Sequence, residues 1–160
     1  MANEGFPAVA TFAAACFWGV QDAFDKTEGV IETTAGYAGG TAPNPTYKQV
    51  CDGGTAHVEA VQVKYDPNRV SYEALLEVFW AQVPKITLLA LDYHTGQYMP
   101  VIFYHSEGQR RLAEASRRHI LGSGNGKLGA KLVAIKAATE FWPEPDEYHQ
   151  HYCQKQGKCH

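Results

Sequence analysis

The alternation of apolar and polar positions predicts a series of strands and helices along most of the chain. Helical spacing of Phe17, Val20 and Phe24 predicts a helix over 16–26, and similar spacing predicts helices over 72–82 and 107–121. Runs of apolar or alternating residues predict strands at 9–14, 30–37, 57–65, 101–104 and 132–137. Intermixed strands and helices are typical of a two-layer α/β or α+β domain, and the pattern alone does not choose between them.

The last twenty or so residues differ from the rest of the chain. From Phe141 onward the sequence has Pro143, Pro145 and many polar residues, with no sustained period. No linker or internal repeat divides what precedes. We therefore expect a single domain over 1–160, with 141–160 as an irregular tail over it.

Composition excludes several classes of protein. The chain has 160 residues, 45% of them hydrophobic, and a net charge of −3, which gives no reason to expect a nucleic-acid partner. No stretch approaches the roughly 18 apolar residues of a membrane helix, and the apolar segment 6–20 lacks the basic start of a signal peptide. Four cysteines are too few for a disulfide scaffold. We expect a cytoplasmic protein whose thiols are catalytic or metal-binding.

Cys16 stands where the first predicted strand gives way to a helix. A thiol at a helix N-terminus meets the positive end of the helix dipole and unpaired N–H groups, both of which favour the thiolate. The thiolate is the nucleophilic form, so this position favours a reactive cysteine. A small buried side chain beside Phe17 and Trp18 is the alternative interpretation.

Glu59 lies in the strand predicted over 57–65. Alternate residues of a strand share a face, and Glu59 has the same parity as Val61 and Val63, whereas Gln62 and Lys64 have the other. A carboxyl group on an apolar face is costly, and proteins retain such a group where a neutral acid must donate a proton. The alternative is a solvent-facing Glu at the start of the strand.

The C-terminal tail brings two cysteines close together in sequence, Cys153 and Cys159. On a mobile segment they could resolve an oxidised sulfur elsewhere in the protein. Two alternatives stay open: a tail without a role, and a zinc site, for which the candidate ligands would be His149, His151, Cys153, Cys159 and His160.

These residues fall within segments that together resemble the A-type peptide methionine sulfoxide reductases, from about residue 12 to 152. Each segment alone is weak, but their order and spacing are specific. They are Cys16-Phe17-Trp18-Gly19-Val20, Gly36-Tyr37-Ala38-Gly39-Gly40, Asn44-Pro45-Thr46-Tyr47, Val50-Cys51, His57-Val58-Glu59-Ala60-Val61, Tyr65-Asp66-Pro67, Ser71-Tyr72-Glu73, Phe79-Trp80, Gln97-Tyr98 and Tyr148-His149-Gln150.

The resemblance implies an enzyme that reduces methionine S-sulfoxide within proteins, with free methionine sulfoxide as an additional candidate substrate. Cys16 would attack the sulfoxide sulfur and become a sulfenic acid, and Glu59 would protonate the oxygen. Tyr47 and Tyr98 would hydrogen-bond that oxygen. The side chains that would hold the substrate are Phe17 and Trp18, around the S-methyl group, and Asp92.

The resemblance also implies a redox cycle without a metal or organic cofactor. Cys159, with Cys153 as the alternative or an intermediate, would resolve the sulfenic acid, and thioredoxin would restore the thiols. It implies an α+β fold, a two-layer sandwich with a ferredoxin-like mixed sheet, flanking helices and a long C-terminal coil. We expect a monomer with a role in protein repair and antioxidant defence.

This chain departs from the family pattern at several positions. Ala15 replaces the usual Gly before the nucleophile, and Gln21 replaces a common Glu. Residues 83–91 replace a characteristic segment, and Asp92 stands six residues before Tyr98 instead of five. A thiol hydrolase with His57 or His94 as its base, and an inactive sulfoxide-binding relative, are the remaining alternatives.

Overall fold

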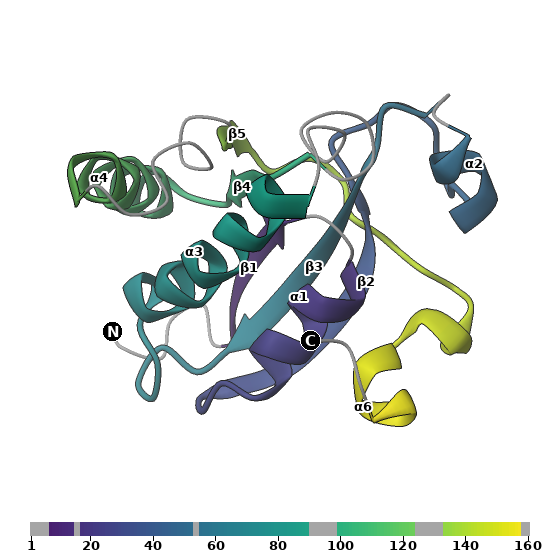
Figure 1. Cartoon of the computed structure of the whole chain (residues 1–160), viewed down its shortest axis with the longest axis horizontal. Coiled ribbons are helices and arrows are strands. Elements are labelled where there is room, and N and C mark those ends of the chain that lie inside the picture. Colours follow the sequence, from purple (N-terminus) through teal and green to yellow (C-terminus); the bar gives the residue numbers. More distant parts are fainter. Residues whose placement is uncertain (1–6, 15–16, 53–54, 90–98, 124–132, 158–160) are drawn as a thin grey trace.

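The computed structural model describes residues 7–14, 17–52, 55–89, 99–123 and 133–157. Figure 1 shows how the elements are arranged. The strands are β1 (Ala8–Ala13), β2 (Val30–Ala38), β3 (Val58–Tyr65), β4 (Val101–Tyr104), β5 (Ala134–Ala137) and β6 (Trp142–Pro143). The helices are α1 (Phe17–Asp25), α2 (Tyr47–Cys51), α3 (Tyr72–Leu89), α4 (Glu107–Ser123), the 3-10 helix η3 (Glu147–His149) and α6 (Tyr152–Gln156).

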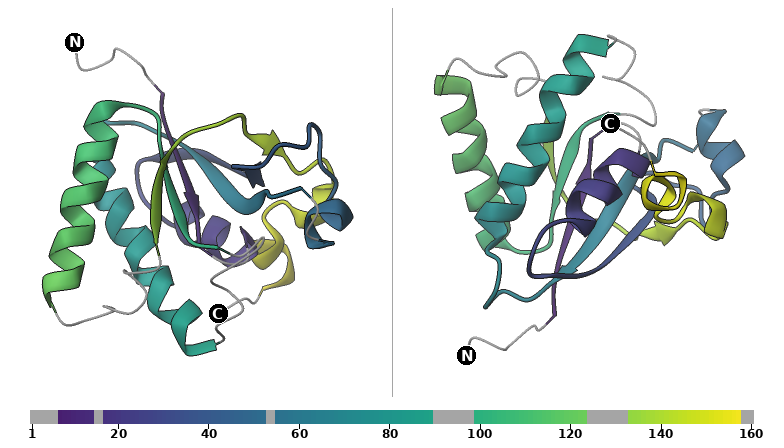
Figure 2. Two further views of the ribbon diagram at one scale, coloured as in Figure 1. Left: turned by 90° about the horizontal axis from the view of Figure 1, so that it is seen from above. Right: turned by 60° about the horizontal axis from the view of Figure 1, so that its bottom comes forward.

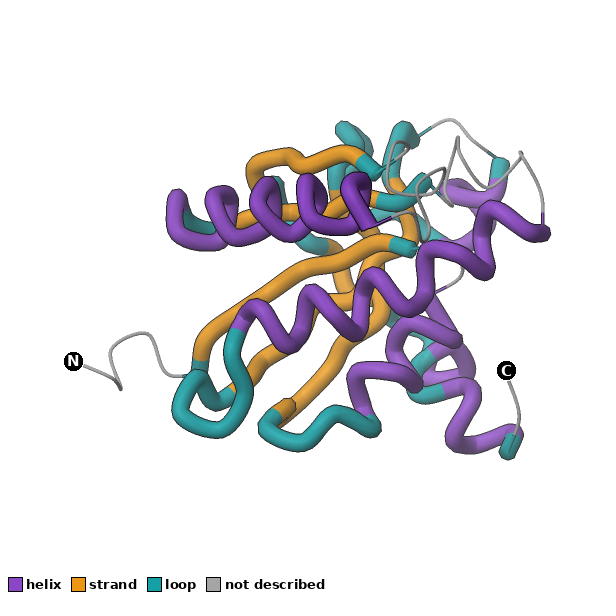
Figure 3. Tube along the Cα trace, turned by 60° about the vertical axis from the view of Figure 1, so that its left-hand side comes forward, coloured by secondary structure: helices purple, strands orange, loops and turns teal. Residues whose placement is uncertain are grey.

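The strands form one mixed sheet in the order β5-β4-β1-β3-β2-β6. All its neighbouring pairs are antiparallel except β4 and β5, which are parallel. Helices α1, α3 and α4 lie against one face of the twisted sheet (Figures 2 and 3). This arrangement confirms the α+β fold with helices layered on a mixed sheet.

The core between the sheet and these helices is largely aromatic. Phe12 of β1 is fully buried, and its ring lies 5.1 Å from that of Phe24 in α1 and 5.6 Å from that of Phe79 in α3. Neighbouring β3 contributes Val61 and Val63 to the same cluster. Because strand residues alternate between faces, these residues place every second side chain of β3, Glu59 included, on the helix-covered face.

The opposite face of the sheet has a smaller cluster of apolar residues. It contains the strand residues Ala13, Ala38, Val58, Ala60, Val101 and Phe103, with Phe141 packed against them. Phe141 begins the C-terminal segment, which therefore touches the sheet before it continues along its edge. β6 pairs with β2 through Gly36 and Tyr37.

Most helix and strand boundaries lie within two residues of those predicted from the sequence. The exceptions are the length of α3, the short helix α2 and the C-terminal segment. The helix predicted over 72–82 is longer and continues through Pro84 to Leu89. α2 was not predicted because five residues are too short to show a period; a capping box of Thr46 and Gln49 defines it. No described helix is both long and apolar enough to cross a membrane.

The C-terminal segment has more regular structure than predicted. Instead of coil alone it contains β6, η3 and α6, and α6 lies beside α1 (Figure 1). α6 begins after His151, which has a left-handed backbone with φ of 53°. The reason for this local structure lies in contacts with α1 and β2, described below.

Candidate active site

Glu59 is buried at the N-terminal end of α1. The residue is only 1% exposed, and its Oε1 accepts a hydrogen bond of 3.1 Å from the backbone N–H of Phe17, the first residue of α1. The prediction from strand parity is thus confirmed, and the solvent-facing alternative is wrong. The first N–H groups of a helix have no partner within the helix, and Glu59 satisfies one of them.

This hydrogen bond places the carboxyl group of Glu59 next to the peptide bond that joins Cys16 to Phe17. Cys16 itself lies outside the described residues. The structure therefore places Glu59 at the first residue of α1, which Cys16 precedes in sequence.

A cluster of aromatic rings surrounds the start of α1. Trp18 stacks on Tyr152 of α6, with ring centroids 3.8 Å apart. Phe17 is 1% exposed, and its ring lies 6.2 Å from that of Tyr47 at the start of α2. The ring of His149 stacks on those of Trp18 and Tyr47, at centroid distances of 5.7 Å and 4.3 Å. Three segments that are distant in sequence, α1, α2 and the C-terminal segment, thus meet at one aromatic site beside Glu59.

His149 is a site residue to which the sequence assigned no role in catalysis. Its Nδ1 accepts a hydrogen bond of 3.2 Å from Nε1 of Trp18. Because an indole N–H can only donate, Nδ1 must present its lone pair, and the ring proton is then on Nε2. The tripeptide Tyr148-His149-Gln150 was part of the family resemblance, and that motif was the available signal.

Glu144 carries a second buried carboxyl group, which the sequence did not reveal, and Tyr37 connects it to the neighbourhood of Glu59. Tyr37 is opposite Glu59 in the register of β2 and β3, and its hydroxyl donates to Oε1 of Glu144 at 2.5 Å. Glu144 is 4% exposed. Burial raises the pKa of the Tyr37 phenol well above its ordinary value, and the hydrogen bond to Glu144 and the charges of Glu144 and Glu59 raise it further.

Cys153 lies in α6, next to the backbone of Trp18. It is 4% exposed, and its Sγ lies 3.2 Å from the backbone oxygen of Trp18. Cys153 carries a disulfide bond. The second tail cysteine, Cys159, lies outside the described residues.

The structure thus brings together Phe17, Trp18, Tyr47, Glu59 and Cys153, five of the predicted site residues. The other four predicted site residues, Cys16, Asp92, Tyr98 and Cys159, lie outside the described residues.

Two of the alternative interpretations find no support among the described residues. No group of three or more His, Cys, Asp or Glu side chains in the described ranges is arranged to hold a metal ion. Both ring nitrogens of His57 are engaged with the neighbouring loop: Nδ1 accepts from the Gly40 N–H at 3.0 Å, and Nε2 lies 2.7 Å from the Ala42 carbonyl oxygen. His57 is therefore a structural residue of this loop. The other proposed base, His94, lies outside the described residues.

Comparisons with known proteins find relatives in sequence and in fold. The sequence pattern of the family described as peptide methionine sulfoxide reductase matches residues 8–160. The chain is 49% identical over 148 residues to peptide methionine sulfoxide reductase MsrA of Methanothermobacter thermautotrophicus, covering 91% of this chain and 86% of the relative.

Two solved structures resemble the fold. Methionine sulfoxide reductase A of Corynebacterium diphtheriae is 26% identical, with a TM-score of 0.73 over 95% of this chain and 76% of the other. Mxr1 of Saccharomyces cerevisiae in complex with Trx2 is 21% identical, with a TM-score of 0.53 over 90% of this chain and 83% of the other. At that identity, the second likeness concerns the fold alone.

Proposed function

The chain belongs to the peptide methionine sulfoxide reductase family, and on that premise we propose that it reduces the S epimer of methionine sulfoxide to methionine. The substrate is the sulfoxide within proteins, and free methionine sulfoxide as well. The observation that supports this most directly is the buried carboxyl group of Glu59 at the start of α1.

In the reducing step, the thiolate of Cys16 attacks the sulfoxide sulfur and Glu59 donates a proton to the oxygen. The attack forms an S–S bond, and the protonated oxygen leaves as hydroxide when the S–O bond breaks. Hydroxide then attacks the sulfur of Cys16 and breaks the S–S bond, which releases methionine and leaves Cys16 as a sulfenic acid. Sulfur of the substrate is thereby reduced and sulfur of Cys16 is oxidised. Sulfoxide oxygen is a poor leaving group until it is protonated, and an acid in a desolvated site is suited to that task. Tyr47 and Tyr98 hydrogen-bond the same oxygen.

The aromatic cluster binds the methyl end of the substrate. Phe17 and Trp18 provide the apolar surface for the S-methyl group, and Asp92 positions the rest of the substrate. The contacts of Trp18 with Tyr152 and His149 support this role, because they fix the indole ring and limit the entropy lost when a substrate binds.

In the recycling step, Cys153 attacks the sulfenic acid of Cys16 first. Its thiol and the sulfenic acid form a disulfide and release water, and exchange with Cys159 then passes the disulfide towards the end of the chain. The position of Cys153 beside Trp18 supports this order. A dithiol, thioredoxin, takes up the disulfide and restores the thiols; a similar fold occurs in the complex of Mxr1 with Trx2.

The proposed cycle receives its electrons as thiols. No metal or organic cofactor takes part in the cycle. The chain acts as a single catalytic domain and a monomer in the cytoplasm, in protein repair and defence against oxidation.

The test uses the purified full chain, each epimer of a blocked methionine sulfoxide, and dithiothreitol. We expect methionine from the S epimer and none from the R epimer, because reductases act on one epimer each. Cys16→Ser is the matched inactive variant and should abolish turnover. Failure of the chain to reduce the S epimer would overturn the proposal.

A further inference from the structure

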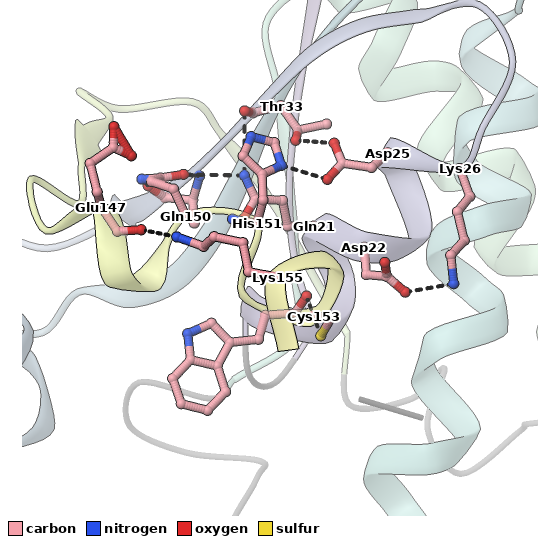
Figure 4. Close-up of polar contacts among 12 residues, drawn as sticks. Gln21, Asp22, Asp25, Lys26, Thr33, Glu147, Gln150, His151, Cys153 and Lys155 are labelled. Atoms are coloured by element: carbon pink, nitrogen blue, oxygen red, sulfur yellow. Dashed lines mark hydrogen bonds and ion pairs between the residues drawn. The ribbon is translucent and has the colours of Figure 1, made fainter. Parts of the chain in front are cut away.

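A network of polar side chains fastens the C-terminal segment to α1 and β2 (Figure 4). Gln21 of α1 is at its centre and is fully buried. Its Oε1 accepts the backbone N–H of His151 at 2.7 Å, and its Nε2 donates to Oε1 of Gln150 at 3.1 Å. We call the network of Gln21, Asp25, Thr33, Gln150 and His151 the tail clamp.

The orientation of Gln150 suits an amide at residue 21. Gln150 pairs with the backbone of Ala35 in β2: its Oε1 accepts from the Ala35 N–H at 3.0 Å, and its Nε2 donates to the Ala35 carbonyl at 2.9 Å. These two bonds turn an acceptor oxygen of Gln150 towards Gln21. Residue 21 therefore has to donate on that side and accept from His151 on the other, which a carboxylate cannot do.

His151 is held in an uncommon backbone conformation by the same network. A left-handed residue other than glycine costs about 1–2 kcal/mol, and its φ is 53°. Two contacts offset that cost: the N–H bond to Gln21, and a 2.7 Å contact between Nδ1 and Oδ2 of Asp25. Asp25 is fixed in turn by the hydroxyl of Thr33, which donates to Oδ1 at 2.5 Å.

The conformation of His151 decides where α6 begins and where Cys153 lies. Cys153 follows His151 by two residues, and in this disulfide-bonded form its Sγ lies 3.2 Å from the backbone oxygen of Trp18 in the first turn of α1. Because only one residue separates Cys153 from the fixed backbone of His151, the sulfur of Cys153 is confined to a small volume. Such confinement raises the effective concentration of a reacting group.

We propose that Gln21, Asp25 and His151 are positioning residues for the recycling step: they hold Cys153 beside the start of α1 so that it condenses rapidly with the sulfenic acid of Cys16. The condensation joins the two sulfurs and releases water from the sulfenic hydroxyl and the thiol hydrogen. The side chains of the tail clamp are not assigned to the sulfoxide, so their loss should slow recycling far more than sulfoxide reduction. The assignment of the tail clamp to recycling rests on the proposed function. Its effect on the position of Cys153 rests on the geometry of the clamp alone.

The first test is independent of sulfoxide chemistry. In a Cys51→Ser, Cys159→Ser chain, titration with reduced and oxidised glutathione measures the effective concentration of the Cys16–Cys153 pair. We expect Gln21→Glu and His151→Gly to lower it at least tenfold. Glycine at 151 keeps the positive φ without strain, so this variant tests the imidazole contact even if Gln21→Glu does not fold.

The matched control for this titration is Asp22→Asn, on the same helix. Asp22 forms an ion pair with Lys26 of 2.9 Å and is not part of the tail clamp. Asp22→Asn should leave the effective concentration of the Cys16–Cys153 pair within twofold of its value in the Cys51→Ser, Cys159→Ser chain. Parent-like values for both clamp variants would overturn the proposal, whatever the outcome of the sulfoxide assay.

The second test separates the two halves of the cycle in the otherwise unmodified chain. Without reductant, Gln21→Glu and His151→Gly should slow the later loss of thiols at least tenfold and slow the formation of the first equivalent of methionine far less. Dimedone should then trap more sulfenic acid at Cys16. Equal slowing of both steps would show a general structural defect and overturn the assignment of these residues to recycling.

Discussion

The backbone N–H of Phe17 donates to Oε1 of Glu59 over 3.1 Å, and both residues are 1% exposed. The bond needs only a carbonyl-type oxygen, and both a carboxyl group and an amide have one. The structural contribution of Glu59 can therefore be separated from any proton that it donates. An isosteric amide keeps the first and removes the second.

Glu59→Gln should keep the fold and lose most of the activity. We expect kcat for the S epimer to fall about 10²–10⁴-fold, the contribution typical of a positioned general acid. The thermal unfolding midpoint should stay close to that of the unmodified protein, because the amide oxygen still accepts the Phe17 N–H. Steady-state assays with dithiothreitol and calorimetry check the two expectations. Retained activity would exclude Glu59 as the acid.

The two tail cysteines should differ in which step they affect. Cys153→Ser should slow the disappearance of the sulfenic acid after one turnover, because Cys153 is the cysteine beside the first turn of α1. Cys159→Ser should leave that step fast and slow turnover with thioredoxin instead. Rapid-quench trapping with dimedone, beside thioredoxin-coupled assays, distinguishes the two. A reversed pattern would make Cys159 the first resolving cysteine.

Tyr37→Phe should destabilise the protein at neutral pH, since it takes the phenolic donor from the buried carboxyl group of Glu144. Loss of one such partner costs about 1–3 kcal/mol. The pKa of Tyr37 is raised in the folded protein, chiefly by burial. Above about pH 10 the unfolded phenol ionises while the folded one does not, so the stability of the unmodified protein falls there.

The difference between the two proteins should therefore shrink as pH rises above about 10. Urea unfolding at pH 7, 9 and 10.5 measures it. Tyr65 and Tyr72, whose pKa values burial also raises, are present in both proteins and cancel in the comparison. A difference that stays constant with pH would contradict the role of burial at Tyr37.

The sequence predicted those parts of the fold and site that depend on local pattern. The parity of residues along β3 was enough to predict that Glu59 is buried. Helical spacing was enough to predict that Phe17 lies in the helix that begins near residue 16. Family resemblance added Trp18 and Tyr47. None of this required knowledge of which distant segments meet.

The tail could not be predicted because its structure depends on partners far away in sequence. Gln21 bonds to His151 across 130 positions, and Trp18 bonds to His149 across 131. A five-residue helix such as α6 has no period to detect, and a left-handed His151 has no signature in sequence. The pairing of Tyr37 with Glu144 escaped prediction for the same reason, since 107 positions separate them.

His105→Gln should flatten the dependence of stability on acid. Nε2 of His105 lies 2.9 Å from the Thr11 hydroxyl, and desolvation of the ring lowers its pKa although the residue is exposed overall. The unfolded chain then binds a proton more readily than the folded one. The contribution of His105 is present above about pH 6.5 and is lost as pH falls.

Glutamine can still bond to Thr11 but does not titrate, so His105→Gln should lose less stability than the unmodified protein between pH 7 and 5. Parallel urea unfolding series at these pH values test the expectation. Identical slopes for the two proteins would show that other groups determine the acid sensitivity.

Gly36→Ala should loosen the start of the C-terminal segment. Gly36 pairs with Pro143 of β6. A methyl group on Gly36 would clash with the Trp142 carbonyl oxygen and would lie 2.7 Å from Cζ of the Phe141 ring. Because a backbone atom cannot yield as a flexible side chain does, β6 must move away from β2. Overpacking of this kind costs about 1–3 kcal/mol.

The expected result of Gly36→Ala is a lower urea midpoint together with slower loss of thiols after one turnover, since β6 leads into the tail clamp. Gly19→Ala in α1 is the control. Among the described residues, no atom outside the adjoining part of α1 lies within 4 Å of a methyl group added at Gly19. Alanine is also favoured over glycine in a helix by about 1 kcal/mol. This control should leave stability equal or higher. If Gly36→Ala behaved in the same way, the contact between β2 and β6 would not be what fixes the tail.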